Sequence, residues 1–114
     1  QLAFLHIIEG STGGPRDHVQ GDKPFDYGAF RSAYRNAGGK GAWIVNNGYD
    51  SALANQSLQE GADMVAFGRP FISNPDLTRR LREGAELNKP DRATFYGGGA
   101  KGYTDYPTLQ QQQA

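Results

Sequence analysis

Residues 43–67, WIVNNGYDSALANQSLQEGADMVAF, contain the pattern that decides the fold. Residues 43–45 and 64–67 are short apolar runs of the kind found in buried strands. Between them, Asp50 can cap an amphipathic helix that stops at Gly61. Because apolar strands joined by a helix normally form a right-handed crossover, the stretch predicts two neighbouring parallel strands.

The same strand and helix pattern occurs before and after this stretch. Residues 2–8 predict a further strand, and Asp26 can cap a helix that ends before a Gly-Gly pair. After the last strand, a helix is predicted to start with Asn74 as its N-cap and to end at Gly84. Three strand and helix units in a row predict an α/β fold with a parallel sheet.

A sheet of only three parallel strands leaves both of its edges without partners. Two architectures remain: a small open α/β domain, or the last part of a (β/α)8 barrel of about 250 residues or more. In the second case the other strands are on another chain or missing. Residues 1–109 are then expected to form a single partial domain, with the Gln-rich residues 110–114 frayed.

The composition excludes several classes of protein. Among 114 residues, 12 Lys and Arg balance 12 Asp and Glu, so no strong field attracts a nucleic acid or an anionic membrane. The chain has no cysteine, which excludes a disulfide scaffold, a thiolate zinc site and a cysteine nucleophile, and favours a cytoplasmic location. The sequence shows no metal-ligand spacing. We therefore expect no metal and neither a nucleic acid nor a membrane as partner.

Ligands of parallel α/β folds bind beyond the carboxyl ends of the strands. Two predicted strand exits, Asn46-Asn47-Gly48 and Gly68-Arg69, combine backbone N–H groups with little side-chain bulk, and Arg69 adds a fixed positive fork. This combination suits a phosphate dianion. The alternative is that the glycines only turn the chain and that Arg69 is a solvated surface charge.

Other residues give weaker signals. His6 lies in an apolar strand, where a hydrogen-bonded core histidine is expected before a catalytic one. Glu9 ends the first predicted strand, where it could do acid–base or hydrogen-bonding work. The loop of residues 10–24 is long enough to favour a functional role. The pair Phe95-Tyr96 precedes three glycines and suits either a flat ligand or packing of the tail.

Three strings of residues carry a family likeness. They are VAFGRPFISNPDL at 65–77, FYGGGA at 95–100 and GYTDYPTL at 102–109. In this order and spacing they closely resemble the C-terminal part of the Old Yellow Enzyme family of FMN-dependent ene-reductases, in particular its bacterial alkene and N-ethylmaleimide reductase branch. The resemblance covers residues 2–109.

The resemblance implies a TIM barrel in which the predicted strands of this chain are strands six, seven and eight. It assigns the FMN phosphate to the turns after strands seven and eight, which correspond here to Asn46, Asn47, Gly48, Gly68 and Arg69. Asn47 departs from the pattern, because several relatives have Gly at that position.

The resemblance also has implications for the chemistry. It places Tyr96 on the substrate side of the flavin and Phe95 against its dimethylbenzene edge, and the loop of residues 10–24 at the substrate mouth. The implied reaction is the reduction of small activated alkenes by NAD(P)H through FMN. The family's substrate-binding His/Asn or His/His pair, its proton-donating Tyr and its Arg near flavin N1 come from earlier strands. This chain is therefore expected to hold no catalytic residue.

The missing strands and the start without Met lead us to expect a split, cleaved or circularly permuted enzyme. A companion polypeptide would carry barrel strands one to five, and this chain alone would be inactive. Two alternatives stay open: a non-catalytic partial barrel that binds FMN or another phosphate, and a structural complement of a partner chain.

Overall fold

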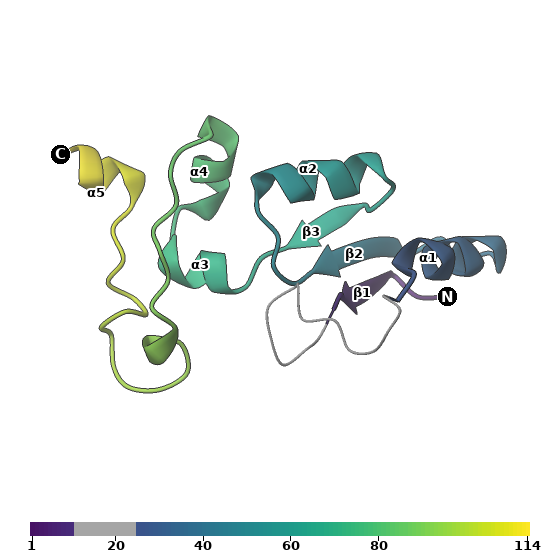
Figure 1. The fold of residues 1–114 in the computed structure, drawn as a ribbon, viewed down its shortest axis with the longest axis horizontal. Coiled ribbons are helices and arrows are strands. Elements are labelled where there is room, and N and C mark those ends of the chain that lie inside the picture. The colour runs from purple at the N-terminus through teal and green to yellow at the C-terminus, as the bar shows by residue number, and fades with distance from the viewer. Residues whose placement is uncertain (11–24) are drawn as a thin grey trace. The chain divides into compact units, whose positions relative to one another are not determined.

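The computed structural model describes residues 1–10 and 25–114, which form two compact units (Figure 1). Unit 1 is Gln1–Ala66 and unit 2 is Phe67–Ala114, and each is described by itself. The single partial domain over residues 1–109 stays a prediction. The loop predicted over residues 10–24 lies, apart from its first residue, outside the described part of the chain.

Unit 1 contains the predicted parallel sheet. Its strands are β1 (Phe4–Ile8), β2 (Ala42–Asn46) and β3 (Met64–Ala66), in the order β1-β2-β3. Both pairings are parallel, with Ile8 opposite Asn46 and Asn46 opposite Ala66. The α/β prediction and all three strands are therefore confirmed, and the carboxyl ends of the strands meet at one edge of the sheet.

Two helices connect these strands, and both begin where the sequence predicts. In α1 (Tyr27–Asn36) the N-cap Asp26 accepts a hydrogen bond from the Ala29 N–H at 2.8 Å. In α2 (Ser51–Gln59) the N-cap Asp50 accepts one from the Leu53 N–H, also at 2.8 Å. A carboxylate at the N-cap satisfies a donor that the helix itself leaves unpaired, which makes both starts readable from the sequence.

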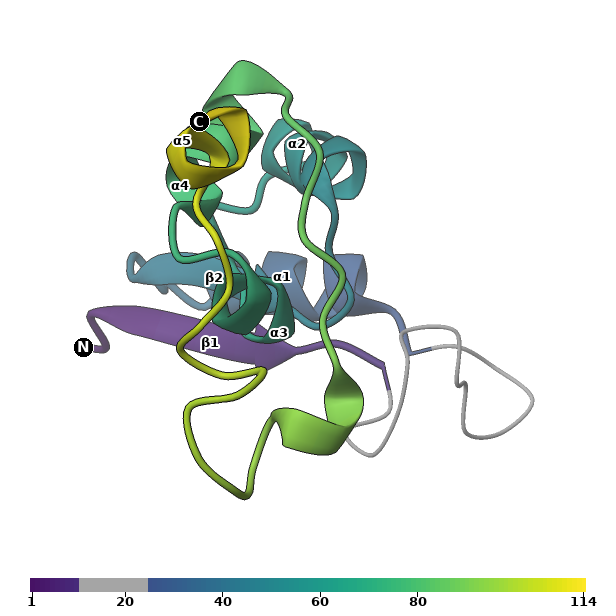
Figure 2. The ribbon, with the colours of Figure 1, turned by 90° about the vertical axis from the view of Figure 1, so that its left-hand side faces the viewer.

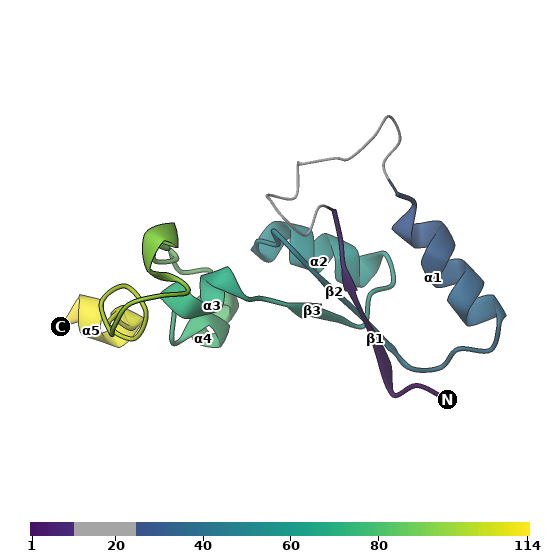
Figure 3. The same ribbon diagram turned by 90° about the horizontal axis from the view of Figure 1, so that it is seen from below.

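The core of unit 1 lies on one face of the sheet. Trp43 is buried there, and the rings of Phe30 and Tyr34 from α1 pack against it, with centroids 5.3 and 5.9 Å away. On the opposite face the side chains of Phe4, Ile8 and Met64 are more than half exposed. Figure 3 shows α1 and α2 beside the strands. The described residues of unit 1 thus cover only one side of an apolar sheet.

His6 belongs to the exposed face of the sheet. It shares that face with Phe4 and Ile8, because side chains alternate along a strand, and it is itself exposed. Within residues 1–10 and 25–114, His6 is therefore not a core residue, and a core histidine stays a prediction for the complete barrel. The strand pattern identifies the two faces, but it does not tell which of them this chain covers.

Unit 2 consists of short helices and connecting segments (Figure 2). They are α3 (Arg69–Ser73), α4 (Leu77–Glu83), a 3-10 helix η1 (Arg92–Thr94) and α5 (Leu109–Gln113). Residues 110–114 were expected to be frayed, whereas most of them form α5, which starts with a capping box between Thr108 and Gln111. None of the helices in the described residues is long and apolar enough to cross a membrane.

The start of α4 also differs from the prediction. Its N-cap is Asp76 and not Asn74. The side chain of Asn74 is fully buried, donates to the Pro70 carbonyl at 2.8 Å and accepts from the Asn88 N–H at 2.7 Å. Because the Asn74 side chain makes these bonds to residues outside α4, it does not cap the helix. The predicted end is confirmed, since Gly84 closes α4 in the left-handed conformation.

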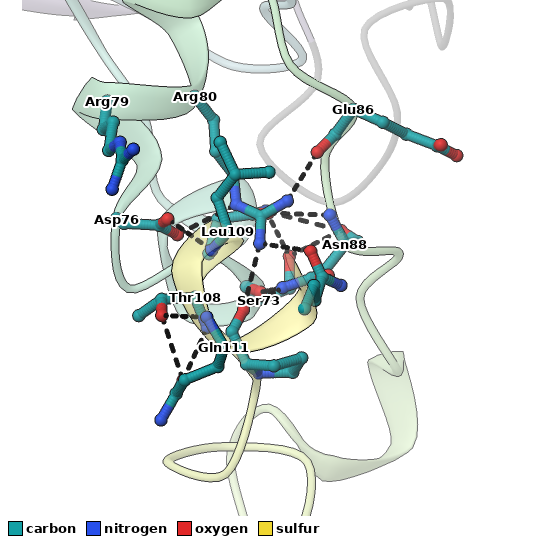
Figure 4. A network of polar contacts seen from close by, with 12 residues as sticks. Ser73, Asp76, Arg79, Arg80, Glu86, Asn88, Thr108, Leu109 and Gln111 are labelled. Atoms are coloured by element: carbon teal, nitrogen blue, oxygen red, sulfur yellow. Dashed lines mark hydrogen bonds and ion pairs between the residues drawn. The ribbon is translucent and has the colours of Figure 1, made fainter. Parts of the chain in front are cut away.

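A buried arginine holds the C-terminal segment to α4 (Figure 4). Arg80 is 1% exposed and donates to the Asp76 carboxylate at 2.8 Å, to the Pro107 carbonyl at 3.0 Å and to the Gln112 side chain at 2.8 Å. The second carboxylate oxygen of Asp76 accepts the Leu109 N–H at 2.7 Å. The bond from Leu109, together with Arg80, lowers the pKa of Asp76 below its ordinary value.

Candidate functional site

The turn between β2 and α2, residues 46–49, has an unusual backbone. Asn47 has φ 97° and the next residue, Gly48, has φ 71°, so both adopt the left-handed region. This region favours glycine, and asparagine is one of the few other residues that tolerates it. Asn47 is the only residue other than glycine with positive φ in the described part of the chain. Asn47 therefore adopts a backbone conformation that glycine also adopts.

The β2–α2 turn offers hydrogen-bond donors to a ligand. Asn46 is the last residue of β2 and is half-buried on the sheet face that carries Ile8. Neither its side-chain amide nor the Gly48 N–H has a hydrogen-bond partner among residues 1–10 and 25–114. Unpaired N–H groups that cluster at a turn are a favourable environment for an anion.

Glu9, which directly follows β1, contacts this turn through its backbone and its side chain. Its N–H donates to the Asn46 carbonyl at 3.1 Å, and its carbonyl accepts from the Asn47 amide. Its carboxylate accepts the Tyr49 hydroxyl at 2.7 Å. Glu9 is 8% exposed, so the predicted hydrogen-bonding position at the end of the first strand is confirmed, and the carboxylate faces the protein interior.

The second predicted turn, Gly68-Arg69, belongs to unit 2. Gly68 is the N-cap of α3, and a Cβ built on it would meet no atom of the described residues within 4 Å, so its backbone is open to a ligand on their side. No hydrogen bond or ion pair within the described ranges engages the half-buried Arg69 guanidinium. Because α3 has only five residues, the attraction for an anion comes from the Arg69 charge more than from a helix dipole.

The aromatic pair after η1 divides into one buried and one exposed ring. Phe95 is 4% exposed, whereas Tyr96 is 87% exposed. Their centroids lie 5.7 Å apart at an interplanar angle of 70°, an edge-to-face pair. Phe95 thus anchors the segment inside unit 2, and Tyr96 presents a ring that a flat ligand could contact.

Sequence reasoning missed Tyr49. Its signal was present, because an aromatic with a polar tip stands between the turn glycine and the helix N-cap. The hydrogen-bond partner of Tyr49 could not be predicted from the sequence, since Glu9 is 40 positions away. Within residues 1–10 and 25–114, no group of three or more His, Asp or Glu side chains could hold a metal ion.

Each unit thus offers groups that can bind a small anion, the β2–α2 turn in unit 1 and Gly68-Arg69 in unit 2, and unit 2 also presents the ring of Tyr96. Residues 1–88 match the sequence model of the family described as "NADH:flavin oxidoreductase / NADH oxidase family". A curated relative from Oryza sativa subsp. japonica, named "Putative 12-oxophytodienoate reductase 13", is 49% identical over 114 residues, which is 98% of this chain and 29% of that protein.

Two solved structures are also similar to this chain. Morphinone reductase superposes with a TM-score of 0.78 and 46% identity, over 99% of this chain and 28% of that one. The old yellow enzyme homologue from Zymomonas mobilis gives a TM-score of 0.75 and 38% identity, over 95% and 29% of the two chains. These neighbours are TIM barrels. The chain thus spans less than a third of each of these relatives and corresponds to a part of that fold.

Proposed function

Because this chain belongs to the NADH:flavin oxidoreductase / NADH oxidase family, we propose that it is the FMN-phosphate-binding part of an ene-reductase. This family includes the old yellow enzymes, so the resemblance found in the sequence is confirmed. Members of the family use FMN with NAD(P)H as reductant. The proposal extends this chemistry to the protein of which the present chain forms a part.

The observation that carries the proposal is the β2–α2 turn. Its Asn46 amide and Gly48 N–H are donors without acceptors in the described part of the chain, on a backbone of left-handed shape. A phosphate supplies the acceptors that such donors need. Asn46, Asn47 and Gly48 are therefore assigned to the FMN phosphate.

The assignment of the second turn rests on the resemblance and on its position directly after β3. Gly68 would offer open backbone, and the Arg69 guanidinium would pair with the phosphate. A guanidinium fork matches two phosphate oxygens at once, which an ammonium group cannot do. This supports a role for Arg69 in affinity for FMN rather than in proton transfer.

Tyr96 and Phe95 are assigned to the flavin ring side of the site. When bound, FMN supplies hydride transfer between NAD(P)H and a small activated alkene. Tyr96 would bound the substrate space with its exposed ring. Phe95, which is 4% exposed, would hold that segment in place, and its assignment to the dimethylbenzene edge rests on the resemblance.

The proposal requires strands that residues 1–114 do not contain. The apolar sheet face of Phe4, Ile8 and Met64 is uncovered by described residues, as expected if β1, β2 and β3 are strands six, seven and eight. Strands one to five, with the catalytic His/Asn or His/His pair, the Tyr acid and the Arg near flavin N1, would come from the remaining polypeptide. A cytoplasmic location belongs to the same proposal.

The substitution Arg69→Ala tests the phosphate assignment in the assembled flavin-binding protein. A charged hydrogen bond contributes about 1.5–3 kcal/mol, so the affinity for FMN should fall roughly tenfold to a hundredfold. Affinity for riboflavin, which lacks the phosphate, should not change. Arg79→Ala is the matched control, because Arg79 is exposed and already paired with Glu83. Equal FMN retention in both variants would refute the assignment.

Tyr96→Ala separates the enzyme from a binding-only partial barrel. If Tyr96 borders the substrate, its loss should impair alkene turnover while the flavin content stays normal. Loss of FMN with unchanged turnover per bound flavin would reverse the roles assigned to Tyr96 and the phosphate residues. Bound FMN without any alkene reduction in the assembled wild-type protein would favour the non-catalytic alternative.

A further inference from the structure

We propose that Glu9 is a positioning residue that holds the β2–α2 turn in its phosphate-binding shape. The inference rests on the proposed function of that turn. Glu9 comes from the end of β1, and yet it contacts three of the four turn residues, namely Asn46, Asn47 and Tyr49.

The three contacts use the backbone N–H, the backbone carbonyl and one carboxylate oxygen of Glu9. The backbone N–H binds the first residue of the turn, the backbone carbonyl accepts from the second, and the carboxylate accepts from the hydroxyl of the fourth. Among residues 1–10 and 25–114, no hydrogen bond joins Glu9 to Gly48, whose N–H is assigned to the ligand. The start and end of the turn are thus held while its central donor stays available.

The turn needs such support because its backbone is strained. A residue other than glycine in the left-handed region costs about 1–3 kcal/mol, and such a conformation persists only when the surroundings impose it. Asn47 is in this situation at φ 97°. Its side-chain bond to the Glu9 carbonyl couples the strained residue to the neighbouring strand.

The carboxylate of Glu9 is itself fixed. A buried polar group is costly unless it is hydrogen-bonded, and Glu9 is 8% exposed with the Tyr49 hydroxyl 2.7 Å away. The same hydroxyl lies 3.1 Å from the Ser57 hydroxyl in α2. One chain of hydrogen bonds therefore joins the end of β1, the end of the turn and the helix that follows it.

A direct role in phosphate binding is unfavourable for Glu9, since a carboxylate repels a phosphate. Its contribution to FMN affinity is therefore indirect, through the orientation of the Gly48 N–H and the Asn46 amide. This makes a specific prediction: weakening the Glu9 contacts should reduce the affinity for the phosphate of FMN and not the affinity for the flavin ring.

The test compares FMN with riboflavin in the assembled flavin-binding protein. Tyr49→Phe removes the hydroxyl that binds Glu9, and Glu9→Ala removes the carboxylate. Loss of one hydrogen bond should lower the ratio of FMN to riboflavin affinity roughly threefold to tenfold. Glu9→Gln keeps an oxygen that can accept from Tyr49, so its ratio should lie closer to wild type than that of Glu9→Ala.

Tyr34→Phe is the matched control. The Tyr34 hydroxyl accepts the Gly41 N–H at 2.9 Å beside the opposite end of β2. Its removal should lower thermal stability without changing the FMN to riboflavin ratio. If Glu9→Ala does not fold, Tyr49→Phe still decides the question, because phenylalanine keeps the ring and removes a single oxygen.

The outcomes distinguish the two proposals. A wild-type protein that binds riboflavin as tightly as FMN would overturn the proposed function, and the role of Glu9 with it. A wild-type preference for FMN that persists in both Tyr49→Phe and Glu9→Ala would overturn the positioning role alone. Equal loss of both flavins would also overturn it, because that result indicates a general structural role.

Discussion

Replacement of Arg80 by methionine should release α5 from α4 without unfolding unit 1. The Arg80 guanidinium is 1% exposed and binds two acceptors of the C-terminal segment, the Pro107 carbonyl at 3.0 Å and the Gln112 side chain at 2.8 Å. Methionine is unbranched and has no donor, so it keeps the packing of the aliphatic part of Arg80 while both acceptors lose their charged donor. The Pro107 carbonyl keeps its second bond, from the Asn88 side chain at 2.8 Å.

The size of the effect follows from these bonds. A hydrogen bond to a charged donor contributes about 1.5–3 kcal/mol, so two of them at the lower value give about 3 kcal/mol. Since about 1.4 kcal/mol corresponds to a factor of ten, the equilibrium constant for release of α5 should rise roughly a hundredfold. For Arg80→Lys, the equilibrium constant for release should lie between those of the wild type and Arg80→Met. The single ammonium group of lysine cannot reach all the acceptors that the guanidinium reaches.

Hydrogen exchange measured on the peptide of residues 107–114 reports this release directly. The control is Arg79→Met at the neighbouring position, where the ion pair with Glu83 is 47% and 46% exposed on its two sides. An exposed pair of this kind contributes less than about 0.5 kcal/mol, so exchange should barely change. If exchange in Arg80→Met matched that in Arg79→Met, the idea that Arg80 holds the tail would be refuted.

Three further predictions concern pH and backbone conformation. The Leu109 N–H and Arg80 lower the pKa of Asp76 below 3.8, so its contribution to α5 docking is complete above that pH and is lost as the pH falls through the lowered pKa. NMR shifts of α5 against pH should show this, and Asp76→Asn should release α5 at neutral pH. At Asn47, φ 97° should make valine about 1–2 kcal/mol worse than glycine in urea unfolding, and equal stability would contradict the strain. Gly102→Ala should destabilise the protein more than Gly38→Ala. Both glycines have positive φ, but only at Gly102 would the added Cβ also meet the side chain of Thr94. The melting temperatures of the two variants test this.

Much of unit 1 could be predicted from the sequence because its signals are local. Apolar runs mark strands, and a carboxylate before an apolar period marks a helix start, as at Asp26 and Asp50. The same holds for the β2–α2 turn, where Asn and Gly tolerate positive φ. The strings that resemble the Old Yellow Enzyme family are also contiguous, so the family needed no structure.

Tertiary structure decided the partners of individual polar groups. Asn74 has the local signature of an N-cap, but hydrogen bonds with Pro70 and Asn88 hold its side chain elsewhere. The neighbours Phe95 and Tyr96 have similar side chains and opposite exposure. Residues 110–113 have no apolar pattern that predicts a helix. They are helical because Thr108 caps them and Arg80 of α4 donates a hydrogen bond to Gln112.

The connection between Glu9 and the β2–α2 turn is the clearest case of this division. Each residue is visible in the sequence, but the bond from Tyr49 spans 40 positions. It exists because parallel pairing of β1 and β2 brings Ile8 opposite Asn46, so that the residues following both strands meet at one edge. Periodicity and caps depend on neighbours along the chain and can be read from the sequence. Hydrogen bonds between distant segments depend on the strand register, which exists only after the sheet has formed.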